Sequence, residues 1–374
     1  MSGRPATAAL SSPQGARVLL NGREAVMLGA NNYLGLASHP AVVEAVVEAT
    51  RRYGLGSCIN PCFVHTPVHA ALERELAAFL GVEDALLFAS CSAANAGVLS
   101  TLAGRGDLVF SDRHNHASII DGCRLSRAEA RVYPYLGVES LEASLAAHEG
   151  GGGRLVITDG VFSMEGALAP LAELLSIANT NGAMLVVDDS HGLGVVGPRG
   201  RGAMAAAGLA PSAVVTTGTF SKALGGAPGG FVAGPTEIVA RLRAESRAFI
   251  FTTGMSVPDA AGALAALRQL VQHPEHVERL WENTRTFRAL LRERGVPVHD
   301  AASPITPLHV GDAGRAKALH AHLLELGVYV PAMVYPVVSH GQARLRAQPS
   351  AALSMDDVAF AANAIAQAFE EIPA

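Results

Sequence analysis

The stretch TTGTFSKALGG, residues 216–226, runs from a β-like segment into a turn of hydroxyl residues and glycines, with Lys222 between them. A lysine that bonds to a cofactor aldehyde must extend from a rigid element, and its neighbours must be small so that a flat, phosphorylated ring can approach the backbone. A strand end followed by a Gly-rich turn is also a common boundary between elements. The surrounding sequence therefore decides between these two interpretations.

A pair of acids follows an upstream strand. The apolar residues 184–187 are typical of a buried parallel strand, and they lead into DDSHG, residues 188–192. Ligands of open α/β sheets bind at the carboxyl ends of strands. Pyridoxal phosphate (PLP) needs a carboxylate at its ring nitrogen, because the protonated ring is the better electron sink. We therefore expect Asp188 to supply this carboxylate and His191 to reach the phenolic oxygen, with a helix N-cap and a surface histidine as the alternatives.

Two more strand ends carry polar or small residues. After the apolar residues 84–88, the small residues 89–97 open an Ala-rich helix, and its free N–H groups and dipole favour a phosphate. Ser90 as an ordinary helix cap is compatible with that role. Residues 111–118 contain alternating histidines, one of which can stack on a cofactor ring. We expect no metal there, because no carboxylate or cysteine partner recurs at ligand spacing.

Several motifs occur in the order in which one known family has them. The chain resembles the α-oxoamine synthases, a family of PLP-dependent enzymes, from about Asn31 to the C-terminal region. The motifs are ANNYLGL (residues 30–36), NHASIIDG (115–122), DGVFSMEG (159–166), VDDSH (187–191) and TFSKALGG (219–226), followed by YPVV (335–338) and GQARLR (341–346).

The resemblance implies an α/β protein of PLP-dependent fold type I, like aspartate aminotransferase, with a mainly parallel, seven-stranded large domain and a smaller C-terminal α/β domain. The alternation of apolar runs with Ala-rich or amphipathic stretches agrees with this. We predict an N-terminal arm with a flexible polar tail at residues 1–45, a PLP-binding large domain at 46–257 and a small domain at 258–374. Strands are expected near residues 85–88, 108–110, 130–133, 154–158, 184–187, 213–217 and 230–233, and in the small domain near 305–310 and 328–334.

The resemblance also implies the roles of the cofactor-binding residues. Lys222 would bond to the cofactor and then remove the Cα proton of the amino acid as general base. Asp188 would pair with the pyridine nitrogen, His191 would bind the phenolic oxygen and His116 would stack on the ring. The remaining contacts to phosphate and ring would come from the backbone at Cys91 and Ser92 and the hydroxyls of Ser163 and Thr219.

Two further implied contacts involve a substrate and a second subunit. Arg344 would bind the carboxylate of the amino acid, with Asn31 beside it, because a guanidinium forms two parallel bonds with a carboxylate. A surface arginine in a strand is the alternative. Thr252 or Thr253 would reach the phosphate of the partner subunit, since the family forms homodimers with shared active sites.

The implied reaction joins an amino acid to an acyl thioester, carried by coenzyme A or a carrier protein, and loses CO2 to give an α-amino ketone. A non-decarboxylative ligase of the 2-amino-3-ketobutyrate type is an alternative within the family. Another fold type I enzyme, such as an aminotransferase or aldolase, is a more distant one. A PLP-binding regulator would need a DNA-binding module, and no basic helix-turn-helix region precedes residue 30.

Composition agrees with an enzyme of this kind. The chain has 374 residues, 49% of them apolar, which is enough for a large core. Its net charge of −5 and the lack of a basic run argue against nucleic-acid or membrane binding. No apolar segment is long enough to span a bilayer and the first residues have no signal-peptide core, so we expect a cytoplasmic protein. Its four cysteines fit no disulfide framework in a chain of this size.

One loop departs from the family pattern. In GSCINPCFVHTPVH, residues 56–69, one position is deleted and Val64 stands where a glycine is usual. Proline fixes φ and a β-branched side chain fills space that a glycine leaves open. Pro228 also replaces a small residue after the lysine. Because the loop borders the substrates in the family, the identities of the acyl donor and the amino acid stay open.

Overall fold

The computed structural model describes residues 8–56, 58, 60–148 and 150–373, and the chain forms two compact units. The larger unit comprises His39–Ser163 and Ala167–Val277, and the smaller one comprises residues 8–38, Met164–Gly166 and residues 278–373. The smaller unit therefore combines segments from both terminal parts of the chain. The predicted division at residues 45 and 257 stays a prediction, and residues 1–7 of the predicted flexible tail lie outside the described residues.

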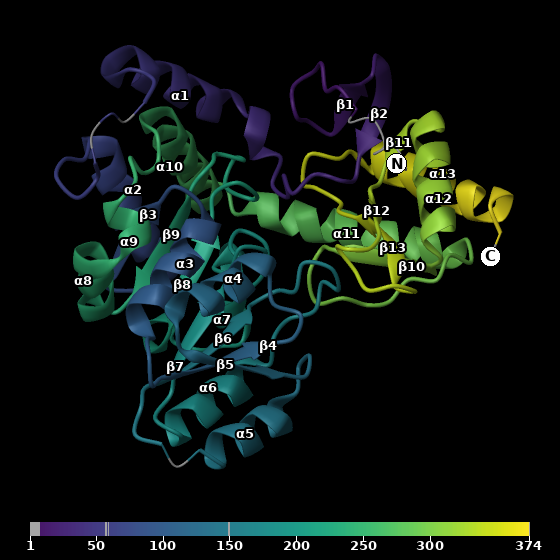
Figure 1. The fold of residues 1–374 in the computed structure, drawn as a ribbon. Helices are drawn as coiled ribbons and strands as arrows, with labels where there is room; N and C mark the ends of the chain where they lie inside the picture. The colour runs from purple at the N-terminus through teal and green to yellow at the C-terminus, as the bar shows by residue number, and fades with distance from the viewer. Residues whose placement is uncertain (1–7, 57, 59, 149, 374) are drawn as a thin grey trace, which may run out of the picture. The chain divides into compact units, whose positions relative to one another are not determined.

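The larger unit is built on a seven-stranded sheet with the strand order β3-β9-β8-β7-β6-β4-β5 (Figure 1). Strand β9 runs antiparallel to both of its neighbours, β3 and β8, and the other pairs are parallel. Six carboxyl ends therefore lie at one edge of the sheet. The strands are β3 (Asp84–Phe88), β4 (Leu108–Asp112), β5 (Glu129–Tyr133), β6 (Arg154–Asp159), β7 (Met184–Asp188), β8 (Val215–Thr219) and β9 (Gly230–Gly234).

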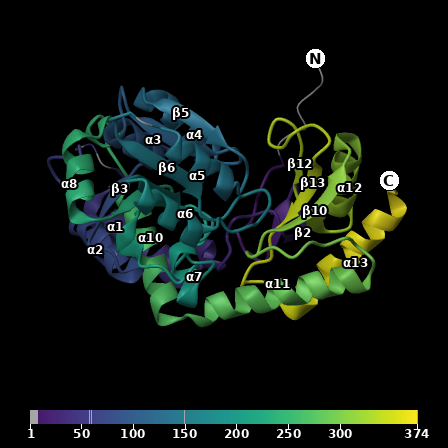
Figure 2. The same ribbon diagram turned by 90° about the horizontal axis from the view of Figure 1, so that it is seen from below.

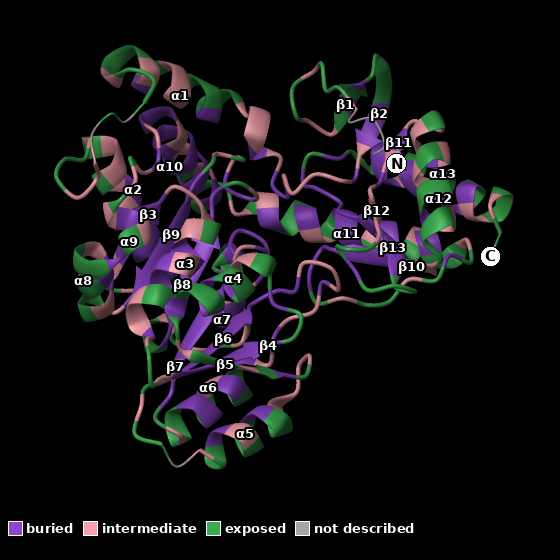
Figure 3. Cartoon of the chain, viewed as in Figure 1, coloured by how far each residue is buried: buried purple, intermediate pink, exposed green. Residues whose placement is uncertain are grey.

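Helices of the larger unit alternate with these strands, as the sequence pattern predicted. They are α1 (Pro40–Tyr53), α2 (Pro67–Leu80), α3 (Cys91–Leu102), α4 (Ala117–Ser126), α5 (Val138–Ala146), α6 (Leu171–Thr180), α7 (Ala203–Ala206), α8 (Thr236–Glu245), α9 (Arg247–Ile250) and α10 (Val257–Gln272). The central strands are buried on both faces (Figure 3), because helices cover them and their sequences are almost wholly apolar. This confirms the predicted fold class.

The smaller unit contains two three-stranded sheets, ordered β1-β2-β11 and β10-β13-β12. Figure 2 shows β10, β12 and β13 next to α12. Its elements are β1 (Arg17–Leu20), β2 (Arg23–Met27), η1 (Leu36–Ser38), most of α11 (Glu275–Glu293), β10 (Thr306–Gly311), α12 (Ala313–Glu325), β11 (Val328–Tyr329), β12 (Ala332–Met333), β13 (Ala343–Ala347) and α13 (Met355–Glu371).

The prediction of a single strand near residues 328–334 was wrong, because two strands are present there. The segment forms two short strands, β11 and β12, which belong to different sheets. Pro331 lies between them and has no N–H to donate to a sheet ladder, so pairing stops there. In the part of the chain that the structure describes, no helix is both long and apolar enough to cross a membrane.

Candidate active site

A cavity of about 200 Å³ lies at the edge of the large sheet where the strands β3, β4, β6, β7 and β8 end. Parallel strands bring their carboxyl ends together, so residues that are far apart in sequence become neighbours there. Most of its lining residues carry hydroxyl or thiol groups. The lining consists of Ser90, Cys91, Ser92, His116, Ser118, Asp159, Ser163, Asp188, Ser190, His191, Thr219, Ser221 and Lys222.

Asp188 and Lys222 both line this cavity. Asp188 ends strand β7, and only 3% of its surface is exposed. Its carboxylate accepts hydrogen bonds from Nδ2 of Asn95 at 2.7 Å and from the backbone N–H of Ser190 at 3.0 Å. These two donors stabilise the ionised carboxylate, the form that can pair with a protonated ring nitrogen.

The start of helix α3 forms one wall of the cavity. Ser90 caps this helix, and its Oγ accepts the N–H of Ala93 at 3.1 Å. N–H groups in the first turn of a helix have no acceptor within the helix, so they are available to an anion. Strand β9 lies very close to this turn. A Cβ added at Gly230 would be only 2.3 Å from the backbone N of Cys91. Only glycine allows this contact.

Asp159 is a second acid in the cavity, and it is 5% exposed. Its Oδ2 accepts the backbone N–H of His116 at 3.0 Å. Burial, and after it the charge of Asp188, raises the pKa of Asp159 well above its ordinary value, although Lys222 and the N–H of His116 oppose this. The two acids therefore differ in environment, and the proton is held more firmly on Asp159 than on an exposed carboxyl group.

The thiol of Cys91 lies 3.2 Å from Oγ of Ser190 and 3.6 Å from Oδ2 of Asp188. Burial, and after it the charge of Asp188, raises the pKa of this thiol well above its usual range. A protonated thiol is a poor nucleophile. Cys91 therefore does not compete with Lys222 for an aldehyde in the cavity.

These groups fit PLP. The set combines an amine, an aspartate side chain, a helix N-terminus and several hydroxyls, and the cofactor offers an aldehyde, a ring nitrogen, a phosphate and a phenolic oxygen. The hydroxyl of Thr219 lies 2.8 Å from that of Ser221 and donates to the carbonyl of Gly229, so it is already oriented in the structure.

Comparison with known proteins identifies the family. The family model for class I and II aminotransferases matches residues 23–365. The 8-amino-7-oxononanoate synthase of Symbiobacterium thermophilum is 43% identical, over 97% of this chain and 93% of that protein. The chain is an α-oxoamine synthase. The enzyme of the same name from Geobacter sulfurreducens is 45% identical over the same shares, and a serine palmitoyltransferase variant from S. paucimobilis with bound PLP and myriocin matches with a TM-score of 0.94 and 30% identity, over 98% of this chain and 93% of that one.

Membership of the α-oxoamine synthases establishes the type of reaction. The chain is a PLP-dependent acyltransferase that condenses an amino acid with an acyl thioester and releases CO2, which gives an α-amino ketone. The predicted family, fold type, cofactor and reaction type are thereby confirmed. The roles of individual residues stay predictions.

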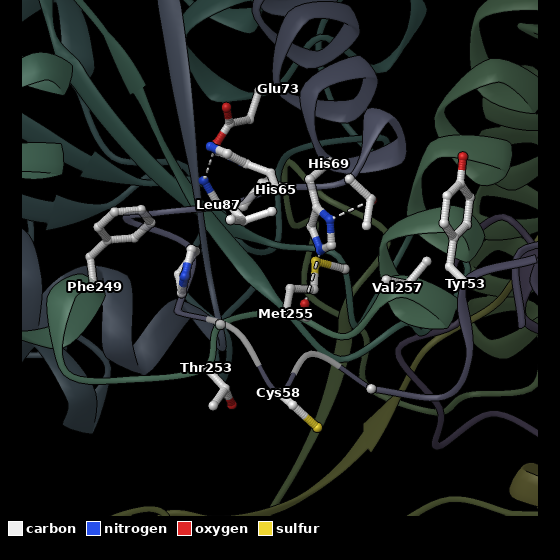
Figure 4. Close-up of a pocket in the computed structure, with 15 residues that line it drawn as sticks. Tyr53, Cys58, His65, His69, Glu73, Leu87, Phe249, Thr253, Met255 and Val257 are labelled. Carbon is white, nitrogen blue, oxygen red and sulfur yellow. Dashed lines mark hydrogen bonds between the residues drawn. The ribbon is translucent and has the colours of Figure 1, made fainter.

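Most of the residues predicted to bind the cofactor lie in the one cavity. These are Lys222, Asp188, His191, His116, Cys91, Ser92, Ser163 and Thr219. Thr253 lines a second cavity of the larger unit, of about 250 Å³, with Cys58, Val64 and His69 (Figure 4). His69 is held there between the hydroxyl of Thr66 and the carbonyl of Met255, both at 2.9 Å. Two residues of the altered loop, Ser57 and Ile59, lie outside the described residues.

Arg344 and Asn31 both belong to the smaller unit, and their predicted roles toward the substrate stay predictions. Asn31 accepts hydrogen bonds from Arg346 at 3.4 Å and from Gln348 at 2.7 Å. The backbone N–H of Gln348 donates a hydrogen bond to the carbonyl of Leu28, and this bond brings the end of strand β13 next to Asn31. Arg344 lies 3.5 Å from Glu165 instead.

Sequence reasoning assigned no role to four polar groups of the cavity: Ser118, Asp159, Ser190 and Ser221. Asp159 opens one family motif, and the other three lie within motifs that contain assigned residues. Asp159, Ser190 and Ser221 lie at or within two residues of a strand end, which is the signal that had selected Asp188. The same signal could therefore have found these three residues.

Asp189 does not line the cavity and offers a test by pH. Burial, and to a smaller extent the charge of Asp188, raises the pKa of Asp189 to about 8, and its Oδ1 is buried without a hydrogen-bond partner. Below about pH 4 both folded and unfolded chains hold this proton, and between pH 4 and 8 only the folded chain does, so the free energy of unfolding falls as the pH rises.

The contribution of Asp189 to the slope of the unfolding free energy against pH is about 1.4 kcal/mol per pH unit between pH 5 and 7, and the variant Asp189→Asn should remove it. Urea unfolding of both proteins across this range measures it. The exposed Asp121→Asn is the control and should leave the slope unchanged. If the free energy of unfolding changed with pH by the same amount in Asp189→Asn and in the unmodified chain, Asp189 would be ionised in the folded chain and the prediction would be wrong.

Proposed function

We propose that the chain is an 8-amino-7-oxononanoate synthase that uses alanine and a pimeloyl thioester. The supporting observation is the name shared by the relatives from Symbiobacterium thermophilum and Geobacter sulfurreducens. Both cover 97% of the chain at more than 40% identity.

The substrates follow from the carbon count of that product. Decarboxylative condensation keeps the Cα, the amine and the side chain of the amino acid and attaches the acyl carbon to Cα. Carbons 8 and 9 with the amine of 8-amino-7-oxononanoate are therefore an alanine without its carboxyl group. Carbons 1 to 7 are a seven-carbon diacid joined through one end, which is pimelate.

Thiol release with a panel of substrates tests the proposal. Alanine, glycine and serine are each combined with pimeloyl, acetyl and palmitoyl thioesters, on coenzyme A and on a carrier protein, and CO2 is measured alongside. We expect the largest kcat/KM for alanine with a pimeloyl thioester and one CO2 per thiol. A preference for serine with palmitoyl thioester would make the chain similar in activity to its structural neighbour. Glycine with acetyl thioester and no CO2 would indicate the ligase alternative.

The location of the protein in the cytoplasm also stays a prediction.

The cavity supports the following roles. PLP, when bound, supplies the electron sink that makes the Cα proton of an amino acid acidic. Asp188 would hold a proton on the ring nitrogen, His191 would bind the phenolic oxygen and His116 would lie on the ring. Lys222 would bond the cofactor and then carry the proton from Cα on Nζ. The start of α3 at Cys91 and Ser92, with Ser163 and Thr219, would bind the phosphate and ring edge.

We propose that one arginine of β13 binds the carboxylate of the amino acid. Arg344 is the residue predicted from sequence, and its Nη1 lies 3.5 Å from the carboxylate of Glu165. Arg346, two residues along the same face, donates to the side-chain amides of Asn31 and Gln348, and it also interacts with Tyr33 and with the charge of Glu165. Glu165 therefore acts on both guanidinium groups and does not distinguish them. We keep Arg344 as the proposed residue, because a guanidinium can form two parallel bonds with a carboxylate.

Matched substitutions distinguish the two arginines. Arg344→Lys should raise the KM for the amino acid by about 10- to 100-fold, because lysine cannot make two parallel bonds to a carboxylate. Arg346→Lys should change this KM much less. Both variants should keep the absorbance of bound PLP. A large effect in Arg346→Lys alone would move the role to Arg346, and a fall in kcat without a change in KM would remove both from carboxylate binding.

We also propose that a second copy of the chain covers the surface around Thr253. Three large apolar side chains of two touching loops, Leu55, Phe63 and Phe251, are 71–82% exposed. The loops are joined by a hydrogen bond from Asn60 to the carbonyl of Ile250. Exposed apolar patches of this kind mark interfaces. Sedimentation should give a dimer, and a fully active monomer would contradict a shared active site.

A further inference from the structure

Asn95 in helix α3 has a polar side chain that is completely buried, and it is not part of the cavity lining. Its Nδ2 donates to Oδ2 of Asp188 at 2.7 Å and to Oγ of Ser118 at 2.9 Å. Its Oδ1 accepts the hydroxyl of Thr217 at 2.7 Å. One amide therefore connects helix α3 with the end of β7, with β8 and with the start of α4 (Figure 1).

Only an amide satisfies these partners together. A carboxylate at Asp188 can only accept, so it requires the NH2 group of Asn95. The hydroxyl of Thr217 then meets the amide oxygen and must donate to it. The orientation of the amide is fixed by these two contacts. An apolar residue of the same size would leave two buried groups, at Asp188 and Thr217, and the half-buried Ser118 without this partner.

The network continues to the histidine of the cavity. Oγ of Ser118 accepts from Asn95, so its own hydrogen is available for Nδ1 of His116, 2.8 Å away. The backbone N–H of Ser118 also donates to this nitrogen, at 3.2 Å. A nitrogen that accepts twice carries no proton. The chain of bonds from Asp188 through Asn95 and Ser118 therefore keeps His116 neutral, with its proton on Nε2.

We propose that Asn95 is a positioning residue that sets the direction of the Asp188 carboxylate and the tautomer of His116 at the same time. This inference rests on the proposed roles of these two residues toward PLP. It is independent of which amino acid and thioester react. Asp188 has a second fixed bond, to the N–H of Ser190, and Asn95 supplies the one that joins it to the histidine.

PLP itself is the probe for the test. The dissociation constant of PLP from the apoprotein and the pH midpoint of the absorbance of bound PLP are measured for Asn95→Leu and Asn95→Asp. Asn95→Leu should weaken PLP binding at least about tenfold, because the side chain of Asp188 loses its hydrogen bond from Asn95. The same variant should move the pH midpoint of the absorbance of bound PLP. Asn95→Asp should approach the unmodified affinity at acidic pH, where the new carboxyl holds a proton to donate to Asp188, and lose it as the pH rises.

The matched control is Asn179→Leu, an exposed asparagine near the end of α6, which should change neither quantity. If Asn95→Leu does not fold, Thr217→Val carries the test, because it removes the bond that orients the amide and should move the midpoint in the same direction. Unchanged PLP affinity and midpoint in a folded Asn95→Leu, or an Asn95→Asp effect that does not vary with pH, would overturn the proposal. Failure of alanine and pimeloyl thioester to react in the unmodified enzyme would refute the proposed substrates and leave these PLP measurements unaffected.

Discussion

Lys222→Ala is expected to lower kcat by at least about 10²–10⁴-fold, the contribution of a positioned general base. The substitution removes the group that takes the Cα proton and the amine that bonds to PLP. The other groups that line the cavity remain, including Asp188 and His191. The variant should therefore still bind PLP, but release it on dialysis and have the absorbance of a free aldehyde. Steady-state kinetics and spectra of the dialysed protein measure both effects.

The chain offers a direct control, because its only other lysine is Lys317. Lys317 is exposed in α12, and Lys317→Ala should leave kcat and the absorbance unchanged. Hydride reduction of the PLP-loaded protein, followed by peptide mass spectrometry, should mark the peptide that contains Lys222 and no other. Cofactor on the peptide of Lys317, or turnover by Lys222→Ala at the unmodified rate, would refute the assignment.

Much of the larger unit could be predicted from the sequence. A strand that is buried on both faces must be apolar throughout, as Leu185, Val186 and Val187 are, so the strands appear as short apolar runs. Because parallel strands end at one edge, the polar residues after each run could be expected to meet. The cavity with Asp188, His191 and Lys222 follows from that rule alone.

The parts that could not be predicted depend on contacts between distant residues. Asn95 lies within an Ala-rich helix, and nothing in its neighbours shows that Asp188, 93 positions later, is its partner. Glu165, the partner of Arg344, lies far away in sequence, so this contact could not be predicted from the neighbours of either residue. Register in β13 decides which arginine meets Asn31, and short strands of alternating residues define register weakly from sequence.

The three aspartates near the cavity differ in environment. Asp188 receives hydrogen bonds from Asn95 and Ser190. Burial raises the pKa of both Asp159 and Asp189, and the negative charge of Asp188 raises them further. Carboxyl groups whose pKa values are shifted by burial and by a neighbouring charge are typical of active sites.

Asp188→Asn is expected to lower kcat by about 10²–10³-fold, the loss found when one electrostatic group at a developing charge is removed. The amide is almost the same size as the carboxylate and can still accept from Asn95, so the cavity should keep its shape. A neutral amide cannot hold a proton on the ring nitrogen, so the electron sink is weakened. PLP should remain attached to Lys222. Kinetics with saturating substrates and the absorbance of the bound cofactor measure these two outcomes.

Asp189→Asn is the matched variant, since the same change is made one residue away. It should alter the dependence of stability on pH and leave kcat near that of the unmodified enzyme, because Asp189 does not line the cavity. Asp188→Asn should also lower the pKa of Asp159, because it removes the second largest cause of that shift, and so should change the pH profile of the remaining activity. If Asp189→Asn lost turnover and Asp188→Asn kept it, the acid behind the ring would be Asp189.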